Sequence, residues 1–74
     1  MKIYNNGMHP TYWLEIGEAE DIRIPFDSFY TDDRDPRNTT LINNNRITVS
    51  LWNGASDEFL LLAQEEGIEA TENN

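Results

Sequence analysis

The fold is decided by the stretch LINNNRITVSLWNGASDEFLLLAQEEG, residues 41–67. In its first half, Ile47, Val49 and Leu51 occupy every second position, which is the period of a strand with one buried face. The pair Leu41-Ile42 predicts a short arm that pairs with residues 46–52, and the triple asparagine at 43–45 predicts the turn between the two strands because asparagine tolerates positive φ. The first half therefore predicts a β-hairpin.

The second half of the stretch predicts a helix. Ser56 is the expected N-cap, and the two acids that follow it suit the positive end of the helix dipole. Residues 59–63 provide the buried stripe, although the unbroken apolar run spans more than one helical face. Gly67 suits the left-handed position that ends a helix, and Ile68 is placed to fold back on the last turn. The expected helix is about ten residues long.

Strand alternation recurs before this stretch, in two runs: Tyr12, Leu14 and Ile16, then Ile22, Ile24 and Phe26. Residues 1–4 form a candidate fourth strand, turned back by residues 5–7. Pro25 lacks an N–H donor, so its strand should lie at a sheet edge or carry a bulge. Together these patterns predict a small α+β domain over residues 1–69, with an antiparallel meander of three to five strands, one C-terminal helix on its face, and a flexible acidic tail at 70–74.

The charge of the chain is large, negative and segregated. Its 74 residues include 14 Asp plus Glu and 5 Lys plus Arg, which gives a formal charge of −9. Residues 15–35 carry eight acids and two arginines, a net −6; residues 57–74 carry six acids and no base, also −6; residues 36–56 carry two arginines, +2. Such a balance opposes binding to nucleic acid or to an anionic membrane surface and favours a basic protein partner.

The candidate partner-binding residues come from both acidic blocks and from nearby aromatic positions. Acids spaced like alternate strand side chains, about 6 to 7 Å apart, could imitate a phosphate backbone. Trp13 and Trp52 alternate with the aliphatic faces of their strands, so they form either an exposed docking surface or a second small core. The predicted set is Glu15, Glu18, Glu20, Asp21, Asp32, Asp33, Asp35, Glu65 and Glu66, with Trp13, Tyr30 and Trp52.

The sequence offers little for catalysis or metal binding. Asp33 and Asp35 are spaced as the first ligands of a calcium loop, but Arg37 and Asn38 stand where that loop needs an oxygen ligand and a glycine. There is no cysteine, and His9 is the single histidine, so the familiar zinc sets are excluded. No nucleophile elbow or glycine-rich phosphate loop is present. We therefore expect no metal, no cofactor and no enzymatic activity.

In size and charge the chain resembles the small acidic inhibitors encoded by phages and other mobile elements, including DNA mimics and some anti-CRISPR proteins. The resemblance implies a non-enzymatic inhibitor that occludes a basic nucleic-acid-binding surface of a host protein. The alternative is a structural or assembly module that self-associates, as a homodimer for example, through an aromatic sheet face containing Trp13 and Trp52. The chain shows neither a signal peptide nor a run of about 20 apolar residues, so a cytoplasmic location is expected.

Overall fold

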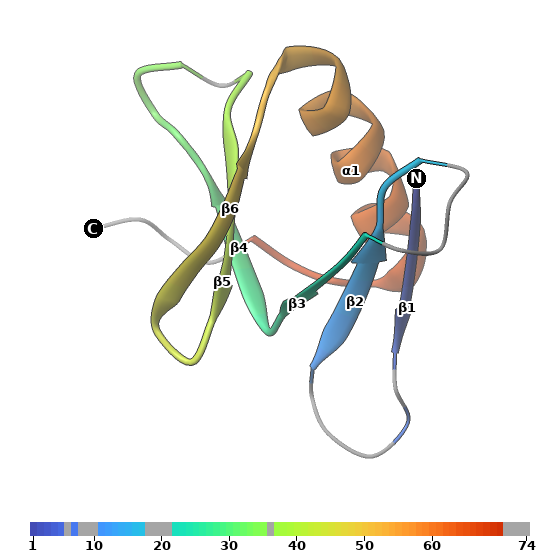
Figure 1. The fold of residues 1–74 in the computed structure, drawn as a ribbon. Coiled ribbons are helices and arrows are strands. Elements are labelled where there is room, and N and C mark those ends of the chain that lie inside the picture. The colour runs from blue at the N-terminus through green and yellow to red at the C-terminus, as the bar shows by residue number, and fades with distance from the viewer. Residues whose placement is uncertain (6, 8–10, 18–21, 36, 71–74) are drawn as a thin grey trace.

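The computed structural model describes residues 1–5, 7, 11–17, 22–35 and 37–70 (Figure 1). Over these residues the chain forms antiparallel strands followed by a C-terminal helix, which confirms the predicted α+β class. The elements are β1 (Lys2–Asn5), β2 (Tyr12–Glu15), β3 (Arg23–Phe26), β4 (Ser28–Thr31), β5 (Thr39–Asn43), β6 (Arg46–Leu51) and α1 (Asn53–Glu66). The predicted tail lies mostly outside the described residues, since these end at Ala70.

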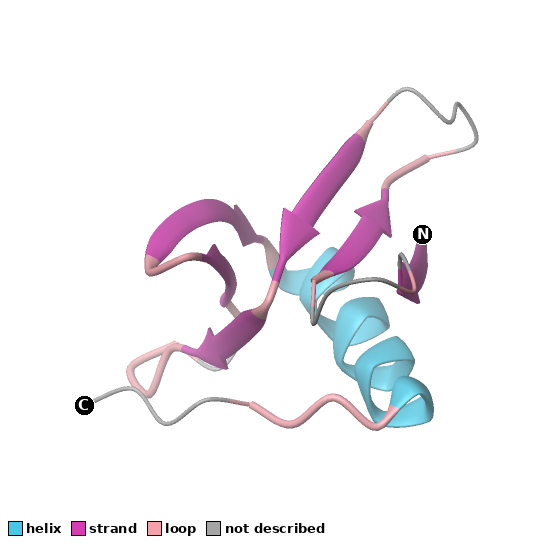
Figure 2. Cartoon of the chain, turned by 90° about the horizontal axis from the view of Figure 1, so that it is seen from below, coloured by secondary structure: helices cyan, strands magenta, loops and turns pink. Residues whose placement is uncertain are grey.

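The strands divide into two three-stranded sheets, with the orders β1-β2-β3 and β4-β5-β6. Each sheet is an antiparallel meander, and α1 packs against the strands (Figures 1 and 2). Pro25 lies in β3, which is an edge strand of its sheet, as predicted from its missing donor. The expected turn at residues 5–7 falls partly outside the described residues, but β1 and β2 pair as that turn requires.

The chain passes from one sheet to the other at Asp27, a bend that the alternation pattern did not predict. The Asp27 backbone N–H donates to the carbonyl oxygen of Ile42 (2.8 Å), and its carboxylate accepts the backbone N–H of Asn44 (2.9 Å). Phe26 and Phe29 are three residues apart, so a straight strand would place them on opposite faces. The bend lets both rings enter one core, where their exposed fractions are 0% and 2%.

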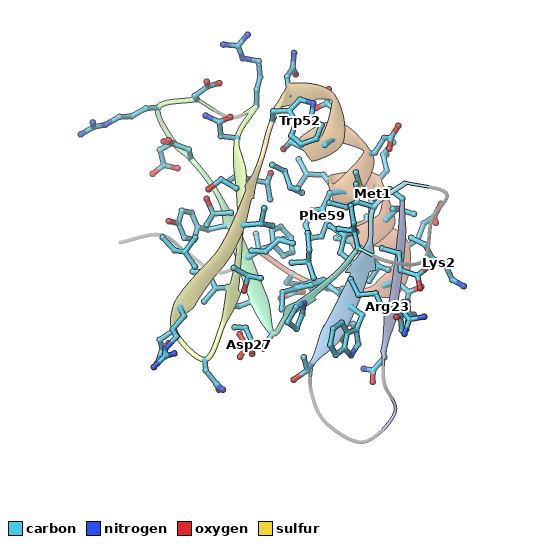
Figure 3. All side chains as sticks on the ribbon, in the orientation of Figure 1. Met1, Lys2, Arg23, Asp27, Trp52 and Phe59 are labelled. Carbon is cyan, nitrogen blue, oxygen red and sulfur yellow. The ribbon has the colours of Figure 1, made fainter. Side chains whose placement is uncertain are left out.

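Phe59 of α1 joins the two sheets at the centre of this core (Figure 3). Its ring meets Phe26 edge to face at a centroid distance of 5.5 Å and meets Phe29 in the same way at 4.9 Å. The remaining buried apolar residues come from both sheets and from the helix: Ile3, Leu14, Leu41, Leu51, Ala55 and Ala63. One aromatic side chain therefore holds both meanders against α1.

The predicted hairpin of β5 and β6 is confirmed, and it contains a bulge. Asn44 and Asn45 have φ values of 53° and 64°, as expected for a two-residue turn with positive φ at both positions. Leu41 pairs with Val49 but Ile42 pairs with Ile47, so Thr48 is an extra residue in β6. The prediction that Ile47 shares the buried face is wrong, because the bulge reverses the alternation and leaves Ile47 65% exposed. Ile22, also expected inside, precedes β3 and is 54% exposed.

The helix is longer than predicted at its N-terminal end. Its N-cap is Trp52, which makes no side-chain capping bond, and Ser56 lies one turn inside the helix, so the expected cap at Ser56 is wrong. The C-terminal end of the helix is as predicted, because Gly67 adopts the left-handed conformation with a φ of 75°. The backbone N–H groups of Gly67 and Ile68 donate to the carbonyls of Gln64 (3.2 Å) and Ala63 (2.9 Å), a Schellman motif.

Candidate functional site

The described acids of the first acidic block, residues 15–35, mostly make ion pairs or hydrogen bonds within the chain. Glu15 pairs with Arg23 across β2 and β3 at 3.4 Å, and its side chain is only 17% exposed. Asp27 holds the β5–β6 turn through Asn44, as described above. These two carboxylates already have partners that stabilise the fold, so they are poor candidates for contacts with another protein.

The acids of the β4–β5 loop also make local hydrogen bonds. Asp32 Oδ1 accepts the backbone N–H of Arg34 (2.8 Å). Asp35 Oδ1 accepts both the backbone N–H (3.2 Å) and the Nε–H (3.0 Å) of Arg37. The side-chain hydrogen bond from Arg37 lowers the pKa of Asp35 below its ordinary value and raises the pKa of Arg37. Asp33 is exposed. The structure thus combines the three predicted loop acids with two arginines, for a net charge of −1.

The acids of α1 are different, because they remain free. Asp57, Glu58, Glu65 and Glu66 are all exposed, and no basic side chain of the described residues lies within ion-pair distance of them. No Lys or Arg follows Arg46 in the sequence. With 1.5 Å of rise per residue, the pair at 57–58 and the pair at 65–66 lie about 12 Å apart along the helix. The free acids therefore form two pairs along one helix rather than the strand-like row that the sequence suggested.

Two of these acids, Glu65 and Glu66, oppose the helix dipole. The first turn of α1 contains no acidic residue, and the last turn contains no basic one. Glu65 and Glu66 instead stand at the C-terminal end, where the helix already carries partial negative charge. Each such placement costs about 0.3 to 1 kcal/mol at low salt. Local preferences are often violated where a residue serves a function rather than stability.

An apolar contact point lies among the helix acids. Leu61 is 65% exposed, and Glu58 and Glu65 lie three residues before it and four after it, on the same helix face. An open depression of about 290 Å³ beside it is lined by Met1, Glu58, Leu61, Leu62 and Glu65. That volume lies at the lower limit of the roughly 300–1,000 Å³ of small-molecule pockets.

Leu61 was not among the predicted site residues, because the sequence pattern placed residues 59–63 in one buried stripe. Phe59 and Ala63 are four residues apart and both buried, which fixes the inward face of α1. At 3.6 residues per turn Leu61 then points about 200° away from Phe59. The sequence did contain a signal for this exposure, because the apolar run 59–62 is too continuous for all of its residues to face inward.

The structure does not bring the predicted aromatic residues together. Trp13 is half-buried on β2, on the outer face of its sheet between its cross-strand neighbours Tyr4 and Pro25. Tyr30 is half-buried on β4, in the other sheet. Trp52 is 65% exposed and lies at the start of α1 (Figure 3). Of the remaining predicted residues, Glu18, Glu20 and Asp21 lie outside the described residues.

Neither a metal centre nor a membrane-spanning helix is found in the part of the chain that the structure describes. Its His, Asp and Glu side chains form no group of three or more arranged to hold a metal ion. None of its helical structure is both long and apolar enough to cross a bilayer. No protein-family model, curated protein or solved structure matches this chain. The exposed acids of α1 and the exposed Leu61 make the surface of this helix the best candidate for a functional site.

Proposed function

We propose that this chain is a small, acidic, non-enzymatic inhibitor that binds a host protein through the outer face of α1. The observation that carries the proposal is the contrast between the two acidic blocks. Glu15, Asp27, Asp32 and Asp35 are engaged within the chain, whereas the four acids of α1 are exposed and unpaired among the described residues. Asp57, Glu58 and Glu65 lie on the outward side of α1, whereas Glu66, seven residues after the buried Phe59, lies at the helix end on the inward side. Free carboxylates of this kind attract a basic surface and accelerate encounter with it.

The face offers short-range contacts as well as charge. Leu61 and the depression beside Met1 supply apolar area between Glu58 and Glu65. Interfaces gain most of their affinity from a few well-packed residues, while charged groups around them set orientation and association rate. Leu61 is therefore the proposed anchor, and the carboxylates around it are the proposed partners of Lys and Arg.

The proposed target surface is one that normally binds nucleic acid. Such surfaces are rich in Lys and Arg because their affinity depends on neutralising phosphates. A protein that places carboxylates on them excludes DNA or RNA by competition and needs no catalytic group. This mode of action is that of the phage and mobile-element inhibitors, DNA mimics and anti-CRISPR proteins among them, which the chain resembles in size and charge.

Two variants of equal net charge test where the partner binds. The α1 variant carries Asp57→Asn, Glu58→Gln, Glu65→Gln and Glu66→Gln, and the first-block variant carries Glu18→Gln, Glu20→Gln, Asp21→Asn and Asp33→Asn. Each removes four acids, so each changes the formal charge from −9 to −5. A difference in partner binding between the two variants therefore depends on where the acids lie and not on the total charge.

Tagged wild-type and variant chains are used to capture proteins from host lysate, with washes at about 0.1 M and about 1 M salt. The expected result is a basic nucleic-acid-binding protein that is retained by the wild type and by the first-block variant at low salt and released at high salt. The α1 variant should not retain it. Equal loss from both variants, or capture of no basic protein at either salt, would contradict the proposal.

A further inference from the structure

The outer face of the β4-β5-β6 sheet carries no charged side chain in its paired rows. Phe29, Leu41 and Leu51 point into the core, so the residues that alternate with them point outward. Cross-strand pairing joins Tyr30 to Thr40 and Thr40 to Ser50 in one row, and Ser28 to Ile42 and Ile42 to Ile47 in the next. The face therefore consists of Ser28, Tyr30, Thr40, Ile42, Ile47 and Ser50. Of these, Ile47 and Ser50 are exposed, Ser28, Tyr30 and Ile42 are half-buried, and Thr40 is only 7% exposed.

The bulge at Thr48 adds an isoleucine to this face. Without the extra residue, Ile47 would follow Val49 and Leu51 onto the buried side. With it, Ile47 pairs with Ile42 and is 65% exposed. Bulges redirect side chains at specific places and also discourage pairing at the edge of a sheet. The bulge thus places the Ile47 side chain on the outer face of the sheet. It also makes the edge strand β6 less able to pair with another strand.

We infer that this face is the contact between two copies of the chain. Two molecules of charge −9 repel each other wherever their carboxylates meet, but this face contains none. A two-fold axis would place the uncharged face of one copy on the same face of the other. A chain of 74 residues without cysteine also gains from such burial, because small cores often need an additional source of stability.

The inferred dimer leaves the acidic helix accessible. On the opposite side of the sheet, Thr39 contacts Ser56 and the Phe29 ring contacts Phe59, so α1 covers the inner face. Self-association and the proposed partner binding would use different surfaces. They also respond oppositely to salt, because screening weakens attraction to a basic partner and reduces repulsion between two acidic copies.

Sedimentation velocity of the full chain over a range of concentrations tests the inference. The wild type should form a dimer that becomes at least about tenfold tighter between about 0.1 M and about 1 M salt. Ile47→Asp should be monomeric, and Ile47→Thr, which retains a β-branched strand residue, should dimerise more weakly. The matched control is Ile22→Asp, since Ile22 is 54% exposed and precedes β3, in the other sheet; it should dimerise like the wild type.

Circular dichroism of each variant verifies that it is folded. A wild type that stays monomeric up to about 1 mM at both salt concentrations would overturn the inference. So would a folded Ile47→Asp variant that dimerises like the wild type. Neither result would bear on the α1 proposal, which is tested by capture of a basic protein and not by self-association.

Discussion

The hydroxyl oxygens of Thr39 and Ser56 lie 2.5 Å apart and form a buried hydrogen bond between β5 and α1. Both residues are fully buried, with an exposed fraction of 0%. The bond explains why Ser56 does not cap the helix: its side chain satisfies a threonine of the sheet, while its backbone N–H donates to the Trp52 carbonyl (2.7 Å). Ser56, which the sequence pattern predicts as the helix N-cap, instead makes a tertiary contact with β5.

Removing either hydroxyl should destabilise the fold. Ser56→Ala or Thr39→Val leaves the hydroxyl of the other residue buried and unsatisfied, so each should lower the free energy of unfolding by about 1 to 3 kcal/mol. The double variant should lose much less than the sum, because no unpaired hydroxyl remains. Urea unfolding of the four chains measures this coupling, and additive losses would show that the two hydroxyls do not depend on each other.

Two glycines of the helix region should respond oppositely to alanine. Gly67 has φ 75°, so Gly67→Ala should lower the free energy of unfolding by about 1 to 2 kcal/mol. Gly54 lies within α1, and a β-carbon at this position would meet no atom within 4 Å, so Gly54→Ala should raise the free energy of unfolding by about 0.4 to 1 kcal/mol. Thermal or urea unfolding distinguishes the two, and a stabilising Gly67→Ala would argue against the left-handed cap.

Neutralising the acids at the end of α1 should stabilise the isolated chain. Glu65→Gln and Glu66→Gln each remove a negative charge beside the negative end of the helix dipole, so each should raise the free energy of unfolding by about 0.3 to 1 kcal/mol. The gain should shrink at about 1 M salt. Asp33→Asn, an exposed loop acid, is the control and should change stability by less than about 0.5 kcal/mol. Reduced stability on neutralising Glu65 and Glu66 would show that these acids are structural.

The pair formed by Asp35 and Arg37 predicts a specific acid titration. The hydrogen bond from Arg37 lowers the pKa of Asp35 below 3.8, so the ionised carboxylate favours the folded loop. Its contribution is present above pH 3.8 and is lost as the pH falls through the lower folded-state pKa. Arg37→Ala should raise the Asp35 midpoint toward 3.8 in an NMR titration, whereas Arg34→Ala, with the same charge change in the same loop, should leave it nearly unchanged. Equal shifts in both variants would mean that general loop charge sets the pKa.

Local patterns predicted much of the fold. Alternation identified the strands around Leu14, Phe26 and Leu51, the asparagines identified the β5–β6 turn, and Gly67 identified the helix end. The errors arose where contacts distant in sequence decide the local structure. The bend at Asp27 depends on Ile42 and Asn44, and strand β4 exists because that bend lets Phe29 reach the core.

The candidate site was predicted less completely for the same reason. Sequence identified Glu65 and Glu66 as members of an acidic block, but the block did not show which acids are already engaged. That Asp27 binds Asn44, 17 residues away, and that Glu15 pairs with Arg23 follow only from the folded chain. Leu61 was hidden in an apolar run whose exposed position depends on which helix face packs inward.

The acidic face of α1 is proposed to compete with nucleic acid for a basic surface. The most direct test adds the chain to the captured partner already bound to fluorescently labelled nucleic acid and follows release by anisotropy. The wild type and the first-block variant should displace the nucleic acid equally, and the α1 variant should need at least about tenfold more protein. Formation of a ternary complex without displacement, or displacement by the α1 variant at wild-type concentrations, would contradict the claim.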